Sequence, residues 1–124
     1  MTEKKTSINI DITQFKATII AALQDKKAKD ITELDLSVLG TTLFDSFIIC
    51  TATSNIHAQA LCDNVLLNVK QSLKILPKST EGIGNAQWIL IDYFDIVVHI
   101  FLSEYRTFYD IESLWKDAKI THYE

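Results

Sequence analysis

The chain has 124 residues and a mass of 14.1 kDa, which leaves room for one domain and little more. Apolar residues make up 48% and charged residues 23%, a balance typical of a globular domain with one hydrophobic core. Three glycines and one proline exclude collagen-like, low-complexity and linker sequences. The net charge of −4 at pH 7 argues against a chain that mainly binds DNA or RNA, because such proteins usually carry a basic surplus. An acidic domain instead favours a basic protein surface as its partner.

The cysteine and terminal patterns indicate a cytoplasmic protein. Cys50 and Cys62 lie in apolar segments and form no Cys-x-x-Cys pair, so we expect buried, reduced thiols. Residues 1–10 carry positive charge without an apolar run, which predicts a flexible leader rather than a signal peptide. The longest apolar runs, such as residues 96–102, are far shorter than the roughly 20 residues that span a bilayer, so no membrane partner is expected.

The first half of the chain predicts a helix and two strands. Asp11 resembles the N-cap of a helix whose apolar period continues to about Lys29. Residues 31–36 alternate in polarity, which predicts a strand with one face in water. Residues 37–44 are typical of a connector with room for one helical turn. Residues 46–53 are almost continuously apolar and β-branched, as in a central strand covered on both faces.

The second half predicts a long helix, a hairpin and a final helix. Ser54 is placed to cap a helix whose apolar stripe ends before Pro77. After a loop, residues 87–91 and 96–102 form two strand candidates joined by four residues, which is a hairpin pattern. Ser103 opens the last helical region.

The predicted element order α-β-β-α-β-β-α indicates an α/β fold of the α+β kind, with a single mixed β-sheet flanked by helices. We find no internal repeat and no linker long enough to separate two domains. A single domain over residues 11–120 is therefore expected.

Motifs of phosphate binding and nucleophilic catalysis are absent from the sequence. It contains no Gly-x-x-x-x-Gly-Lys loop, no Gly-x-Gly-x-x-Gly turn and no Gly-x-Ser-x-Gly elbow. His57, His99 and His122 are too far apart to form a local metal motif, so no metal or cofactor is expected. His57 could either meet a partner or cap its loop. His99 lies between hydrophobic residues of a strand, which favours a structural role over acid–base chemistry.

One catalytic alternative stays open. Glu33 and Asp35 are two residues apart on a predicted strand and therefore point to the same side. Paired carboxylates can hold a divalent metal for phosphoryl chemistry, although no phosphate clamp accompanies them and exposed strand faces often carry such charges. A metal-dependent nucleotidyltransferase is thus the alternative to a binding role.

A group of aromatic and charged residues favours the binding role. The predicted hairpin should bring Trp88, Tyr93 and Phe94 together. The hairpin and the last helical region carry these candidate residues: Trp88, Asp92, Tyr93, Phe94, Asp95, Arg106, Tyr109, Glu112 and Trp115. Tryptophan, tyrosine and arginine dominate the hot spots of protein interfaces, although either tryptophan could instead belong to the core.

Three strings resemble the signatures of the Iojap-like ribosomal silencing factors, in the order and spacing of that family. The first is DSFIICTATS, followed by His57 and ALCD; the second is EG, WILIDY and DIVVHIF; the third is RTFYDIE followed by LW. Together they span about residues 12–118. The resemblance implies a fold similar to nucleotidyltransferases without their catalytic pattern, since no Asp-x-Asp occurs in the chain.

The resemblance also implies a function without enzymatic activity. Family members bind the large ribosomal subunit through its protein fourteen, keep the small subunit from joining and thereby repress translation when nutrients are scarce. Relatives that form symmetric pairs make a homodimer an alternative to a monomer. An adaptor with a partner outside the ribosome is a further alternative.

On this resemblance, the expected partner-binding residues are Trp88, Asp92, Tyr93, Asp95, Arg106, Tyr109 and Glu112. Trp88 and Tyr93 are expected as aromatic anchors. Four positions depart from the family pattern, which usually has Tyr, Gly, Arg and Gly where this chain has Ser46, Ala52, Ile56 and Phe94. Because glycine accepts a positive φ that phenylalanine resists, Phe94 predicts either a different turn or an extra apolar contact at the hairpin tip.

Overall fold

The computed structural model describes residues 11–40 and 43–124, so the expected leader at residues 1–10 lies outside the described residues. The helices are α1 (Ile12–Asp25), α2 (Asn55–Leu73), α3 (Ser103–Tyr109) and α4 (Ile111–Leu114), with a 3-10 turn, η1 (Ser37–Leu39). The strands are β2 (Lys29–Asp35), β3 (Ser46–Ala52), β4 (Ser79–Glu81), β5 (Trp88–Asp92), β6 (Ile96–Leu102) and β7 (Lys119–Tyr123).

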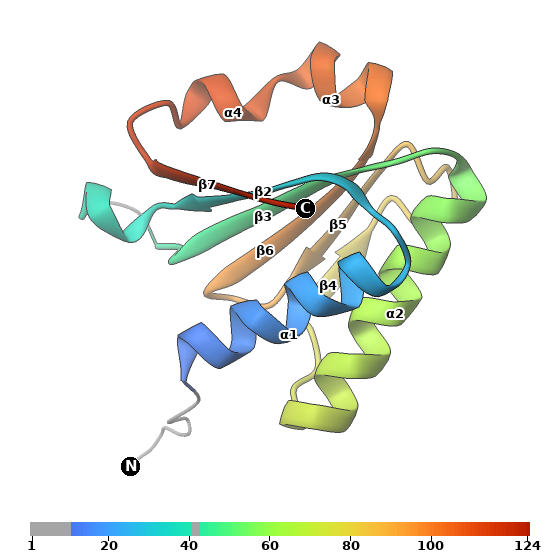
Figure 1. The fold of residues 1–124 in the computed structure, drawn as a ribbon, viewed down its shortest axis with the longest axis horizontal. Coiled ribbons are helices and arrows are strands. Elements are labelled where there is room, and N and C mark those ends of the chain that lie inside the picture. The colour runs from blue at the N-terminus through green and yellow to red at the C-terminus, as the bar shows by residue number, and fades with distance from the viewer. Residues whose placement is uncertain (1–10, 41–42) are drawn as a thin grey trace.

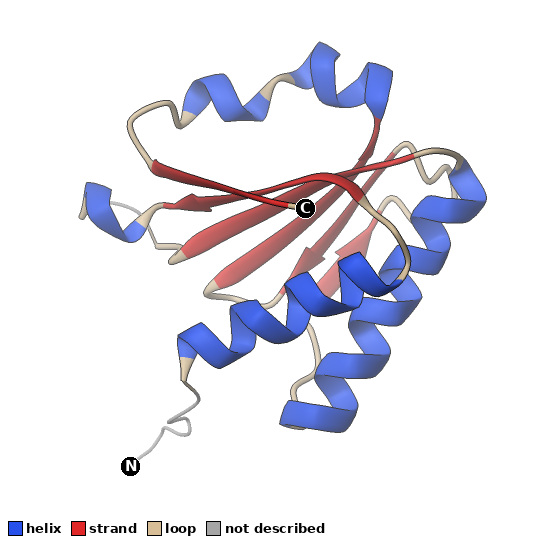
Figure 2. Cartoon of the chain, in the orientation of Figure 1, coloured by secondary structure: helices blue, strands red, loops and turns tan. Residues whose placement is uncertain are grey.

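These strands form one mixed sheet in the order β4-β5-β6-β3-β2-β7. The central pair, β3 and β6, is parallel, and the other neighbouring strands are antiparallel. Helices α1 and α2 lie on one face of the sheet, and α3 and α4 lie on the other (Figure 1). Figure 2 shows the strands as a single layer between the two sets of helices. The predicted α+β fold with one mixed sheet is confirmed.

The caps predicted for both long helices are confirmed. Asp11 Oδ1 accepts a hydrogen bond from the Thr13 N–H at 2.9 Å, where α1 begins. Ser54 Oγ accepts one from the His57 N–H at 3.0 Å, where α2 begins. Each bond satisfies a backbone donor that the first helical turn leaves without a partner.

The larger core lies between the sheet and the pair α1 and α2. It is apolar and includes the fully buried side chains of Ile19, Ile48 and Leu61. Cys50 and Cys62 belong to the same core, as predicted. Burial raises the pKa of Cys50 to about 12 and that of Cys62 to about 11, so both thiols stay protonated at neutral pH.

The strand expected to have one wet face has none. Ile31 of β2 is buried in the core under α1 and α2, and Leu34 is buried in the core on the opposite face. Even Glu33 is nearly buried. The prediction is wrong because both faces of the sheet are covered at β2, one by the core under α1 and α2 and the other by the core that includes Ile111 and Ala118.

The sequence pattern also missed two strands and a helix break. The edge strands β4 and β7 are mostly exposed or half-buried, so they lack a clear apolar signal. The final helical region is divided at Asp110, whose φ of 45° ends α3. Among the described residues, no helix is both long and apolar enough to cross a membrane.

Candidate functional site

The sheet face opposite α1 and α2 is only partly covered, and we call it the half-covered face. Helix α3 packs on β6 and β3, whereas β5 lies beyond it toward the β4 edge (Figures 1 and 2). Along β5, Ile89 and Ile91 point toward α1 and α2 and are buried. Trp88, Leu90 and Asp92 alternate with them, point to the other face and stay half-buried. We call these three residues the β5 row.

Trp88 is the centre of an aromatic cluster. Its ring stacks on Phe101 of the neighbouring strand, with 4.9 Å between ring centroids and 24° between planes. Tyr109, which ends α3, lies 4.8 Å from the same indole and is 47% exposed. The Trp88 Nε1–H donates a hydrogen bond of 3.1 Å to His99 Nδ1. One tryptophan therefore joins β5, β6 and the end of α3.

His99 lies beneath this cluster and is only 4% exposed. Its ring meets Phe47 edge-on, with 4.7 Å between centroids. Burial lowers the pKa of His99 to about 4, so the ring is neutral at physiological pH. Because Nδ1 accepts the Trp88 N–H, the ring proton must lie on Nε2, and that atom has no partner among the described residues.

Carboxylates lie in the β5 row and beside it. Asp92 belongs to the row, and exposed Glu81 of β4 pairs with Leu90, so its side chain lies on the same face. Asp92 Oδ1 also accepts the Phe94 N–H at 2.8 Å. Asp95 is exposed at the hairpin. The half-covered face thus combines an apolar centre with acidic surroundings.

The expectation that Trp88, Tyr93 and Phe94 lie together is wrong, because the described rings in contact with Trp88 are those of His99, Phe101 and Tyr109. The largest difference is at Tyr93. That ring is 3% exposed and lies in the core under α1, where it meets Phe15 edge-on at 5.3 Å. Burial raises the pKa of the Tyr93 hydroxyl well above its usual range. Trp88 begins β5 and Tyr93 follows its last residue, so the two are far apart along the chain direction. Their odd spacing of five residues also places the side chains on opposite faces of the sheet.

Phe94 occupies the hairpin tip with a φ of 76°, a conformation that glycine adopts without strain. The turn therefore keeps a left-handed residue despite the phenylalanine. The ring is 61% exposed, with Lys78 Nζ 5.7 Å from its centroid. Of the two outcomes expected for this position, the structure shows an exposed apolar side chain.

Arg106 ties the α3 segment to the sheet. Its Nε and Nη2 donate to the two carboxylate oxygens of Glu112 at 3.0 and 3.1 Å. Nη1 donates to the Asp30 carbonyl at 2.7 Å and to Thr51 Oγ1 at 2.9 Å. Nη2 also donates to Thr32 Oγ1 at 3.1 Å. All five N–H donors of the guanidinium thus have acceptors inside the protein, so Arg106 and Glu112 hold the fold together.

His57 caps its loop, which is one of its two expected roles. Its Nδ1 accepts the Thr53 N–H at 2.9 Å. The ring proton is therefore on Nε2, which donates to the Lys26 carbonyl at 2.7 Å. The ring connects the end of α1 to the start of α2.

The paired acids of β2 are engaged within the protein. Glu33 Oε2 lies 3.1 Å from Lys16 Nζ, and Glu33 Oε1 accepts the Tyr123 hydroxyl at 2.7 Å. Burial lowers the pKa of Lys16, but its hydrogen bonds to Asp45 and Glu33 outweigh that effect and raise it overall. Asp35 accepts from Ser37, which lowers the pKa of Asp35. The described residues contain no group of three or more His, Cys, Asp or Glu side chains placed to hold a metal ion.

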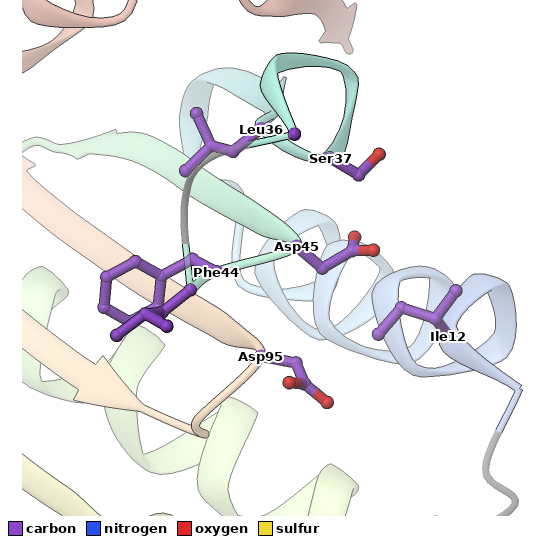
Figure 3. A pocket seen from close by; sticks show the side chains of 8 residues that line it. Ile12, Leu36, Ser37, Phe44, Asp45 and Asp95 are labelled. Carbon is purple, nitrogen blue, oxygen red and sulfur yellow. The ribbon is translucent and has the colours of Figure 1, made fainter.

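A pocket of about 470 Å³ lies between the start of α1, η1 and the ends of two strands (Figure 3). Asp45 and Asp95 extend from these strand ends toward the first turn of α1. Asp45 is already paired with Lys16 at 3.0 Å and accepts the Ser46 hydroxyl at 2.6 Å. Asp45 is therefore engaged within the protein.

Three residues on or beside the half-covered face were missed by sequence reasoning: Glu81, Gly82 and Leu90. Leu90 would have followed from the alternation in β5, once Trp88 was placed on the open face. Gly82 has a φ of 81°, and a Cβ built on it would lie 2.0 Å from the Trp88 carbonyl oxygen. Only glycine lets this loop pass the start of β5, and its place in the string EG was the available signal.

These features define a small α+β domain with one aromatic, partly covered sheet face. Residues 9–124 match the family described as "Ribosomal silencing factor during starvation", and the chain belongs to this family. The resemblance noted in the sequence is thereby confirmed.

Named relatives agree with this assignment. Ribosomal silencing factor RsfS of Chromobacterium violaceum is 40% identical over 110 residues, which cover 89% of this chain and 88% of that protein. Ribosomal silencing factor RsfS of Bacillus subtilis is 36% identical over 100 residues, covering 81% and 83%. A crystal structure of a Chromobacterium violaceum protein gives a TM-score of 0.81 at 39% identity, covering 86% of this chain and 88% of that one.

Proposed function

We propose that this protein binds the large ribosomal subunit through ribosomal protein fourteen and keeps the small subunit from joining. It thereby represses translation when nutrients are scarce, and it acts in the cytoplasm without catalytic chemistry. The names of its relatives support a silencing role at the ribosome. A steric block needs a surface that binds the partner and a molecule large enough to be in the way, and it needs no catalytic group.

The half-covered face is the observation that carries this proposal. An aromatic anchor at the centre of an apolar patch is the usual core of a protein interface, and Trp88 stands in such a place beside Leu90 and Tyr109. The acidic side chains around it, Asp92 and Glu81, suit the positive surface of a ribosomal protein. The net charge of −4 acts in the same direction during encounter.

The expected contact residues divide into two groups. Trp88, Asp92 and Tyr109 belong to the half-covered face, and Asp95 is exposed at the hairpin, so these four expected residues stay in the proposed contact surface together with Leu90 and Glu81. The others act through the fold, because they are buried or bonded internally: Tyr93, Arg106 and Glu112.

Binding of two variants to large subunits and to isolated ribosomal protein fourteen tests the proposal. Trp88→Ala should weaken both interactions about tenfold or more, as expected for an interface anchor. Leu67→Ala is the matched control, because Leu67 is 51% exposed on α2, which packs on the other face of the sheet. Unchanged binding by folded Trp88→Ala would move the site elsewhere. A wild-type protein that binds small subunits equally well would contradict the function itself.

The nucleotidyltransferase alternative has a separate test. Both carboxylate oxygens of Glu33 have internal partners, so the geometry favours a structural role for this residue. Mg²⁺-dependent turnover of a nucleoside triphosphate that Glu33→Gln abolishes would support the alternative. Absence of turnover in the folded wild-type protein would remove it.

A further inference from the structure

We propose that His99 is a positioning residue, which holds the Trp88 indole in the orientation that the β5 row presents to its partner. The inference rests on the proposed function, because it assigns Trp88 the role of anchor. It adds a residue that no partner touches directly, since His99 is almost fully buried beneath the indole.

The contacts of Trp88 are of two kinds. Stacking on Phe101 and packing against Tyr109 bury parts of the ring, but ring contacts of this kind do not bond the indole N–H. The hydrogen bond from Trp88 Nε1 to His99 Nδ1 is directional and fixes where the N–H edge points. The rotamer of the half-buried indole is therefore set from below, by a strand neighbour in the core.

The chemistry of position 99 supports this role over simple packing. A leucine or phenylalanine there would fill the apolar site without introducing polar atoms. Histidine instead leaves its Nε2–H without a partner among the described residues, which is unfavourable in a core. The one useful group that the ring supplies is the Nδ1 lone pair for Trp88. Burial, which lowers the pKa of His99 to about 4, keeps that lone pair available at neutral pH.

Two substitutions separate the acceptor from the volume of the ring. Asparagine places its Oδ1 about where histidine has Nδ1, so His99→Asn retains an acceptor for the indole N–H. His99→Leu retains apolar volume but has no acceptor. The Trp88 indole N–H resonance of the free protein reports the bond directly, and a Trp115→Phe background leaves it as the single indole signal.

We expect His99→Leu to shift that resonance and speed its exchange with water, and His99→Asn to keep it protected. Affinity for large subunits should fall about tenfold in His99→Leu and stay within about threefold of wild type in His99→Asn. An indole resonance and an affinity that are both unaffected in His99→Leu would overturn the proposal, and so would a changed resonance with unchanged affinity.

A double-mutant cycle identifies the path of the effect. Trp88→Phe removes the N–H, so adding His99→Leu to it should cause no further loss of affinity. A full tenfold loss in that background would show that His99 acts by stability alone and would overturn the positioning role. Failure of the proposed function looks different: the wild-type protein itself would not bind large subunits, while the indole resonance would still respond to His99→Leu.

Discussion

The two faces of the sheet are built differently. The face under α1 and α2 is closed by helices of 14 and 19 residues over an almost purely apolar core. The opposite face has a smaller apolar core under helices of 7 and 4 residues, which are too short to be stable alone, and directional polar contacts add to this core. Arg106 and His99 supply these contacts. One face is thus closed by long helices, whereas the other leaves its β5 row half-buried.

The largest expected effect tests the closed face. Leu61→Ala, a fully buried position in α2, should cost about 2–5 kcal/mol in free energy of unfolding, because it leaves a cavity. Leu67→Ala on the exposed side of the same helix should cost less than about 0.5 kcal/mol. Urea unfolding monitored by circular dichroism measures both. Similar losses in the two variants would contradict the assignment of the core.

The next effect concerns the hydrogen bonds by which Arg106 joins α3 to the sheet. Arg106→Ala should lower the free energy of unfolding by about 3 kcal/mol, because it leaves Glu112 and the Asp30 carbonyl without their partner. Hydrogen exchange should then rise in α3 and α4 more than in α1. Arg106→Lys should recover only part of the loss, since lysine lacks the planar fork. Unchanged protection of α3 would show that other contacts hold this helix.

A pH titration of stability tests the buried histidine. The unfolded His99 side chain takes up a proton near pH 6.5, whereas the folded one does so only near pH 4. The contribution of the neutral His99 to the free energy of unfolding is thus fully present above pH 6.5 and is lost as the pH falls toward 4. The loss is about 2 kcal/mol at pH 5. The free energy of unfolding of His99→Asn should fall by about that much less between pH 7.5 and 5. Equal pH dependence in both proteins would contradict a neutral His99.

The smallest effect concerns the strained hairpin tip. Phe94→Gly should raise the free energy of unfolding by about 0.5 kcal/mol, because relief of the left-handed conformation slightly exceeds the entropy cost of glycine. Phe94→Ala is the control, since it removes the ring but keeps the Cβ. Chemical denaturation resolves the difference. Lower stability in both variants would assign the effect to the ring over Lys78 instead of the backbone.

The sequence predicts the elements whose signal is local. The apolar run of β3, the stripe of α2 and the caps at Asp11 and Ser54 each lie within a few residues, and the structure confirms them. β4 and β7 form only because another strand lies beside them, so their sequences carry little pattern.

The candidate site was harder to predict from the sequence for the same reason. Trp88 and Asp92 follow from strand alternation, but the Arg106 network joins residues 55 and 76 positions apart in the chain. No residue spacing in the sequence predicts contacts between residues so far apart in the chain. Tyr93 was wrongly expected beside Trp88, because residues close together in a hairpin can point to opposite faces of the sheet.

The decisive measurement is whether ribosomal subunits still join in the presence of this protein. Purified small and large subunits are mixed with the protein in excess and separated on a sucrose gradient. Wild-type protein and Leu67→Ala should reduce the joined ribosome peak and sediment with free large subunits, whereas Trp88→Ala should do neither. Full joining in the presence of excess folded wild-type protein would show that the protein does not block the subunits.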